Sequence, residues 1–78
     1  MDYETAANTV IKPKLCEIFG NLMGGVIFSG AYVTALKGPT DKDKLTALVT
    51  TICTNQQVLG MWGAAQTETQ KNEWLRLV

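Results

Sequence analysis

The sequence contains no histidine and only two cysteines, Cys16 and Cys53. Without an imidazole, neither a Ser–His nor a Cys–His nucleophile can be assembled. Two distant cysteines without histidine do not make a zinc site, and no glycine-rich phosphate-binding motif occurs. We therefore expect a protein that is not an enzyme and that holds no metal and no cofactor. The two cysteines are expected to be free thiols that pack as small apolar side chains.

Net charge is also lacking. Seven Lys and Arg residues balance seven Asp and Glu residues, so the formal net charge is zero. Proteins that bind nucleic acids depend on an excess of positive charge, and we therefore expect no nucleic-acid partner. A neutral chain also meets little electrostatic resistance to self-association.

The length of 78 residues predicts a single domain that covers residues 1–78. A chain of this size has a thin stability margin and often needs a partner subunit or very tight helix packing. No pattern typical of a secretory signal is evident near the N-terminus. We expect a cytoplasmic protein or a component of an extracellular or viral assembly, with a membrane location as the alternative.

Charge is scarcest over residues 15–36, where Glu17 is the only charged residue. Glycine recurs through this stretch, and each glycine inside a helix costs about 1 kcal/mol relative to alanine. Such glycines are tolerated where another backbone packs close against them. We therefore predict close packing at Gly20, Gly24 and Gly30.

The hydrophobic spacing predicts an all-α fold, a small helical hairpin or bundle. A short N-terminal helix over residues 2–11 is expected to be capped by Asp2 and to stop or kink at Pro13. A glycine-rich apolar helix should follow over residues 14–36 and end at the turn formed by Gly38 and Pro39.

The second half of the chain predicts an amphipathic helix that begins at a Thr40 cap and frays near residues 60–63. Thr67 is expected to cap a last short helix. If the two long helices pack antiparallel about the Gly38–Pro39 turn, Val26 lies near Thr51 and Ile52. The alternative is an α+β fold in which residues 26–33 form a short β-hairpin around Ser29 and Gly30.

The glycine-rich helix has more than one apolar face. The face that includes Leu22, Val26 and Val33 is expected to pair with the second long helix, which leaves an adjoining apolar face uncovered. Tryptophan is enriched at binding hot spots, so both tryptophans are added to the predicted interface. Its residues are Ile18, Met23, Ile27, Ala31, Trp62 and Trp74.

This surplus of apolar surface predicts a protein-interaction or structural subunit. It would bury an apolar helical face by self-assembly into a homo-oligomer or by binding another protein. The alternative is a small membrane-inserted protein with one span at about 15–36, because that run is long enough to cross a bilayer.

Overall fold

The chain becomes helical at an N-terminal cap. In the computed structural model, which describes residues 1–78, the Thr5 N–H donates to the Asp2 carboxylate at 2.8 Å. Hydrogen bonding from Thr5, first through its side chain and then through this N–H, holds the pKa of Asp2 below its usual value. Helix α1 (Tyr3–Ala6) passes without a break into a π-helical turn, η1 (Ala7–Ile11), and then into helix α2 (Lys12–Ala35). The predicted Asp2 cap is confirmed.

Pro13 does not stop the first helix, so of the two predicted outcomes, a stop or a kink, the stop is wrong. Proline lacks an N–H group, and its ring crowds the carbonyl four residues earlier. Here the turn before Pro13 is widened, because the Lys12 N–H donates to the Ala7 carbonyl, five residues back. A π turn of this kind lets the helix continue through the proline.

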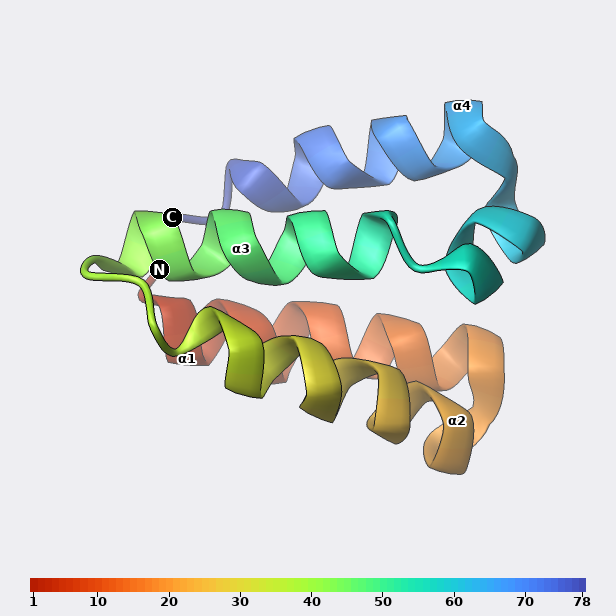
Figure 1. Ribbon diagram of the computed structural model, residues 1–78, viewed down its shortest axis with the longest axis horizontal. Helices are drawn as coiled ribbons and strands as arrows, with labels where there is room; N and C mark the ends of the chain where they lie inside the picture. The colour runs from red at the N-terminus through yellow and green to blue at the C-terminus, as the bar shows by residue number, and fades with distance from the viewer.

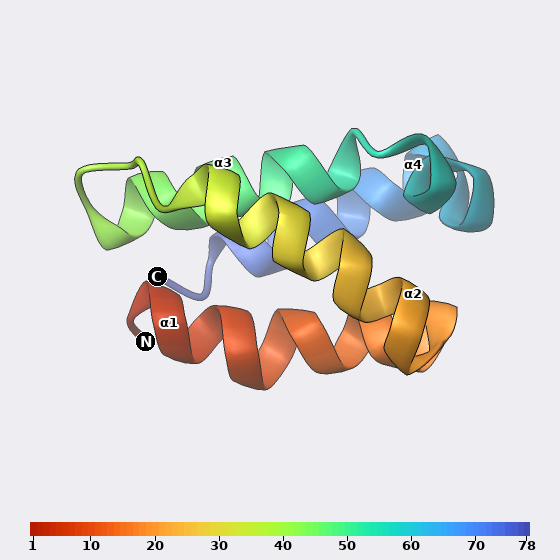
Figure 2. The same cartoon turned by 60° about the horizontal axis from the view of Figure 1, so that its bottom comes forward.

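The helix reverses direction at Gly20 instead. The φ of 85° and ψ of 163° at Gly20 lie in a region that is essentially restricted to glycine. Residues 3–19 and residues 21–35 therefore form two arms that run in opposite directions and pack together (Figure 2). The Lys12 ammonium lies 5.8 Å from the centre of the Phe28 ring on the facing arm. The prediction of one uninterrupted helix over residues 14–36 is thus wrong.

Helix α3 (Asp41–Cys53) begins after the predicted turn. The Asp43 N–H donates to the Thr40 hydroxyl at 3.1 Å, and the same hydroxyl donates to the Asp43 carboxylate at 2.9 Å. The Thr40 cap and the stop at Gly38 and Pro39 are therefore confirmed. Helix α3 lies between α4 and the two arms of the first half (Figure 1).

Helix α3 ends at Cys53, well before the predicted fraying at residues 60–63. Asn55 caps a new helix, α4 (Gln56–Leu75), by accepting the Gln57 and Val58 N–H groups. This helix reverses at Gly63, where φ is 80° and ψ is 163°. Thr67 lies inside α4 and does not cap a separate helix: its hydroxyl donates to the Gly63 carbonyl at 2.7 Å.

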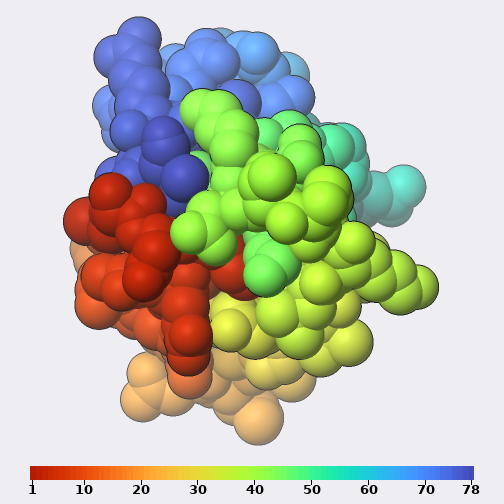
Figure 3. Space-filling view, turned by 90° about the vertical axis from the view of Figure 1, so that its left-hand side faces the viewer, coloured from red at the N-terminus to blue at the C-terminus, as the bar shows by residue number.

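Both ends of the chain and the connection between α2 and α3 meet at one end of the molecule (Figure 3). There, the Lys42 ammonium donates to the Leu75 carbonyl at 2.9 Å and ties α3 to the end of α4. The molecule is all-α and contains no strand, which settles the fold in favour of the helical prediction over the β-hairpin around Ser29 and Gly30.

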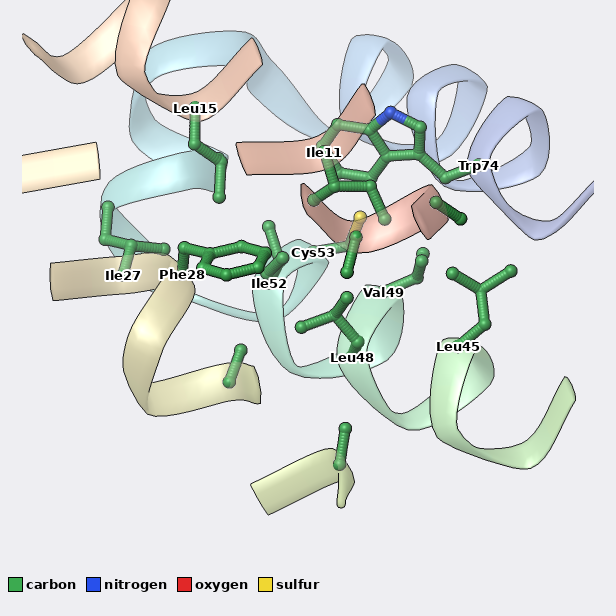
Figure 4. Close-up of a cluster of buried hydrophobic side chains, with 14 of the residues drawn as sticks. Ile11, Leu15, Ile27, Phe28, Leu45, Leu48, Val49, Ile52, Cys53 and Trp74 are labelled. Atoms are coloured by element: carbon green, nitrogen blue, oxygen red, sulfur yellow. The ribbon is translucent and has the colours of Figure 1, made fainter. Parts of the chain in front are cut away.

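The core is centred on α3, which supplies apolar side chains to both of its neighbours. Figure 4 shows Leu45, Leu48 and Ile52 directed toward side chains of the other elements. From α4, Trp74 reaches into the same cluster and is 2% exposed. No buried side-chain nitrogen or oxygen lacks a hydrogen-bond partner. The accessible surface of 4478 Å² is close to the ~4,700 Å² typical of a monomer of this mass.

Candidate interaction surface

Helix α2 presents apolar side chains on two opposite faces. Its inner face, which includes Ile27, Phe28 and Ala31, is buried against the rest of the chain. Directly opposite, side chains at spacings of four, three, four and three residues point away from the molecule, because these spacings follow one side of a helix. We call this face the outer stripe of α2. It consists of Leu22, Val26, Ser29, Val33 and Leu36, the cap residue of α2.

Three members of the outer stripe are the most exposed large apolar side chains of the chain. Leu22 is 85% exposed, Val26 62% and Val33 64%. Leu36, at the end of the stripe, is 48% exposed, and Met23 beside it is 43% exposed. Isolated exposed apolar residues are normal, whereas apolar side chains aligned along one helix face are typical of surfaces that meet a partner or a membrane.

A groove of about 280 Å³ borders the outer stripe between α2 and α3. Val26 and Gly30 belong to its α2 side, and Thr51 and Ile52 to its α3 side. Val26 therefore lies near Thr51 and Ile52, as predicted, but it is 62% exposed and is not buried against them. Asn55 and Gln57 add amide groups to the lining, but the Asn55 carbonyl oxygen is already used to cap α4.

The structure reverses the predicted roles of the two faces of α2. Ile27 and Ala31 were expected at an uncovered interface, yet they are 7% and 3% exposed and pack in the core. The face with Leu22, Val26 and Val33, which was expected to pack on the second long helix, is the exposed one. The reason is the reversal at Gly20: together with α3, the arm formed by residues 3–19 covers the side of α2 that carries Ile27 and Ala31.

The other predicted interface residues divide between surface and core. Met23 is exposed and Ile18 is half-buried. The rings of Trp62 and Trp74 lie 5.9 Å apart and contact each other across the reversal at Gly63. Trp62 is half-buried, whereas Trp74 belongs to the core, so Trp74 is not available to a partner.

The three glycines predicted at close contacts occupy three different environments. A Cβ atom at Gly24 would lie 2.7 Å from the Leu15 carbonyl oxygen and 2.8 Å from the Cys16 Cα atom. The two arms therefore approach closely at Gly24, although the facing backbone is the first arm and not the second long helix. No atom lies near a Cβ built at Gly20 or Gly30. Gly20 serves the chain reversal, and Gly30 faces open space beside the outer stripe.

The two titratable side chains whose pKa values are raised lie in the core and not on this surface. Burial raises the pKa of the Cys53 thiol to about 11, and this thiol contacts the Thr67 carbonyl at 3.9 Å. Burial also raises the pKa of Tyr3 to about 12; its ring stacks on Tyr32 at 5.4 Å. Both Cys16 and Cys53 are free thiols. No cluster of three cysteine, aspartate or glutamate side chains is placed to hold a metal ion.

By length and composition alone, the stretch Tyr3–Ala35 could cross a membrane. The most apolar 18-residue window of this stretch has a mean hydropathy of 1.4, and 28% of that window is buried inside the protein. Core helices of soluble proteins satisfy the same criterion. In the folded chain this stretch is also divided into two arms at Gly20, so neither arm alone has the full length.

Models of protein families, curated proteins and solved structures were all compared with this chain, and none of them matches it.

Proposed function

We propose that this protein is a non-enzymatic interaction or structural subunit that works by burying the outer stripe of α2 against another protein surface. The observation that carries the proposal is the exposure of Leu22, Val26 and Val33 on a helix whose opposite face already lies in the core. Transferring each of these side chains out of water is worth about 1.5–3 kcal/mol when burial is complete. The fold itself gains only the smaller part of that free energy, because these side chains are 62–85% exposed.

The charge pattern supports a protein partner. No charged residue occurs between Glu17 and Lys37, so the outer stripe can be covered without the burial of an unpaired charge. The absence of histidine and of any grouped carboxylates supports a role without catalysis.

The test is the mass of the protein in solution, measured by light scattering after size exclusion at tens of micromolar. We expect an assembly larger than the 8.5 kDa chain. The double substitution Val26→Glu and Val33→Glu should convert it to a monomer, because it places two charges on the outer stripe. The matched control is Thr50→Glu with Gln66→Glu, which adds the same charge at exposed sites on α3 and α4. A wild-type monomer, or an assembly that both double variants leave intact, would contradict the proposal.

A membrane span is the second candidate, because the stretch Tyr3–Ala35 has suitable length and hydropathy. It would require the reversal at Gly20 to straighten into one continuous helix. Alkaline carbonate extraction of membranes from cells that express the protein separates the two functions. An interaction subunit is released into the soluble fraction, whereas a spanning protein stays with the lipid.

A further inference from the structure

The outer stripe of α2 has the spacing of a coiled-coil seam. Residues 22, 26, 29, 33 and 36 alternate four and three apart, which is the pattern of a and d positions in a heptad repeat. A stripe restricted to a and d positions is narrower than the face that packs a helix on a globular core. It matches the contact surface of one helix that pairs with another of the same kind.

The residue types at these positions match a two-stranded pair. Val26 and Val33 occupy the a positions, and Leu22 and Leu36 occupy d positions. Valine at a with leucine at d favours two parallel strands. Ser29 occupies the central d position, where it lies opposite its own copy when the two helices are parallel and in register. A polar residue within such a seam fixes the alignment at some cost in stability.

The positions that flank the seam explain two glycines that the fold does not require. Gly25 lies on one side of the outer stripe and Gly30 on the other. No atom comes within 4 Å of a Cβ built at either position. Each glycine costs the helix about 1 kcal/mol relative to alanine, and nothing inside the chain offsets that cost. Flanks without side chains allow a second helix to approach the seam closely.

The flanking positions also carry no charge along the length of the seam. In coiled coils, charged residues beside the seam select a different partner or repel an identical one. Here Met23, Gly25, Gly30 and Tyr32 occupy those places. With a net charge of zero, two copies of the chain approach without electrostatic opposition.

The size of the surface fits a small dimer. The apolar side chains of the outer stripe and Met23 are between 43% and 85% exposed, and this single helix face is smaller than the ~800 Å² that each partner buries in a standard interface. Two heptads are too short to form a stable coiled coil from unfolded peptides. In this protein, however, α2 is already held in its helical form by its inner face, so the ordering cost of pairing is small.

We propose that two copies of this chain pair through the outer stripes of α2 as a parallel, two-fold symmetric helix pair. Val26, Ser29 and Val33 of each copy lie against the same residues of the other. The opposite face of α2, with Ile27 and Ala31, packs against the rest of each copy. This inference rests on the proposed function and names its partner as a second copy of the same chain.

Cysteine cross-linking tests the pairing. In a Cys16→Ser background, in which the buried Cys53 is retained, Ser29→Cys should form a covalent dimer on mild oxidation. Leu36→Cys should do the same, because parallel helices place both copies of that residue at one end. The matched control is Thr34→Cys, which replaces an exposed hydroxyl residue on the same helix but away from the seam. This control should not form a covalent dimer. Before oxidation, the wild-type protein in solution should have twice the 8.5 kDa chain mass.

The other outcomes overturn the inference in distinguishable ways. Cross-linking at Ser29→Cys but not at Leu36→Cys indicates antiparallel helices, in which the two copies of residue 36 lie about 21 Å apart along the axis. The Val26→Glu and Val33→Glu variant can also dissolve an assembly that contains more than two copies or that does not cross-link at position 29. This result leaves the proposed function standing and removes this inference. A wild-type monomer at tens of micromolar removes both.

Discussion

The two halves of the molecule use the same backbone device but expose different surfaces. In each half a helix reverses at a glycine with positive φ, Gly20 in the first and Gly63 in the second, and both have a ψ of 163°. In each case a Cβ atom at the glycine would meet nothing within 4 Å. The reversal therefore depends on backbone conformation and not on a tight contact at the glycine itself.

The segments that follow the two reversals differ in their outer faces. After Gly63, Thr67, Gln70 and Trp74 are buried, and the exposed residues between them are polar, as in an ordinary amphipathic helix. After Gly20, the exposed face is as apolar as the buried one. The comparison shows that the fold does not demand the apolar outer face of α2, because an equivalent arm in the same molecule does without one.

The largest expected effect concerns the close contact between the two arms of the first half, at Gly24, which has no counterpart among the glycines of the second half. Gly24→Ala should lower the free energy of unfolding by about 2–4 kcal/mol, because its Cβ would overlap the backbone of Leu15 and Cys16. Gly25→Ala is the matched control: it faces open space and should stabilise the helix by up to about 1 kcal/mol. Urea unfolding followed by circular dichroism measures both. Equal midpoints for the two variants would show that the arms do not approach at Gly24.

The next effect tests whether the two reversals are equivalent. Gly20→Ala and Gly63→Ala should each cost about 1–3 kcal/mol, since an L-residue is strained at these dihedral angles and no steric clash adds to the cost. In a chemically synthesised chain, D-alanine at position 20 should restore the stability, because a D-residue accepts positive φ. A loss of stability with D-alanine equal to that with L-alanine would point to a requirement for space rather than for conformation.

The start of the second half could be predicted from the sequence, because the signals around Thr40 agree with one another. Thr40 caps α3 where the hydroxyl and Asp43 suggested, and the buried side of α3 follows its predicted apolar stripe, including Leu45 and Ile52. The Asn55 cap was missed, although Asn is a strong capping residue and stands directly before the first residue of α4.

The first half was harder to predict for two physical reasons. Several glycines lie in one apolar run, and composition does not reveal that Gly20 alone takes a positive φ. The two faces of α2 are equally apolar, so periodicity could not show which one is buried. Only the reversal at Gly20, which brings the first arm against α2, assigns Ile27 to the core and Val26 to the surface.

The smallest expected effect is the change of stability with alkaline pH. It depends on one buried acidic group from each half, Tyr3 and Cys53. The unfolded chain loses the thiol proton near pH 9.0 and the phenol proton near pH 10.0, whereas the folded chain retains them until about pH 11 and about pH 12. Between these values the unfolded state binds fewer protons, so the free energy of unfolding decreases as pH rises. The stabilisation is complete below pH 9 and is lost progressively up to pH 12.

Urea midpoints measured from pH 7 to pH 12 separate the two contributions. Cys53→Ala should remove the part of the decrease that begins near pH 9, and Tyr3→Phe the part that begins near pH 10. Tyr3→Phe should have little effect at pH 7, because the phenol donates only one long hydrogen bond, 3.5 Å to the Tyr32 carbonyl. If the free energy of unfolding of both variants still decreased fully at alkaline pH, other acidic groups of the chain would cause the decrease. The burial of Tyr3 and Cys53 would then not explain the pH dependence of stability.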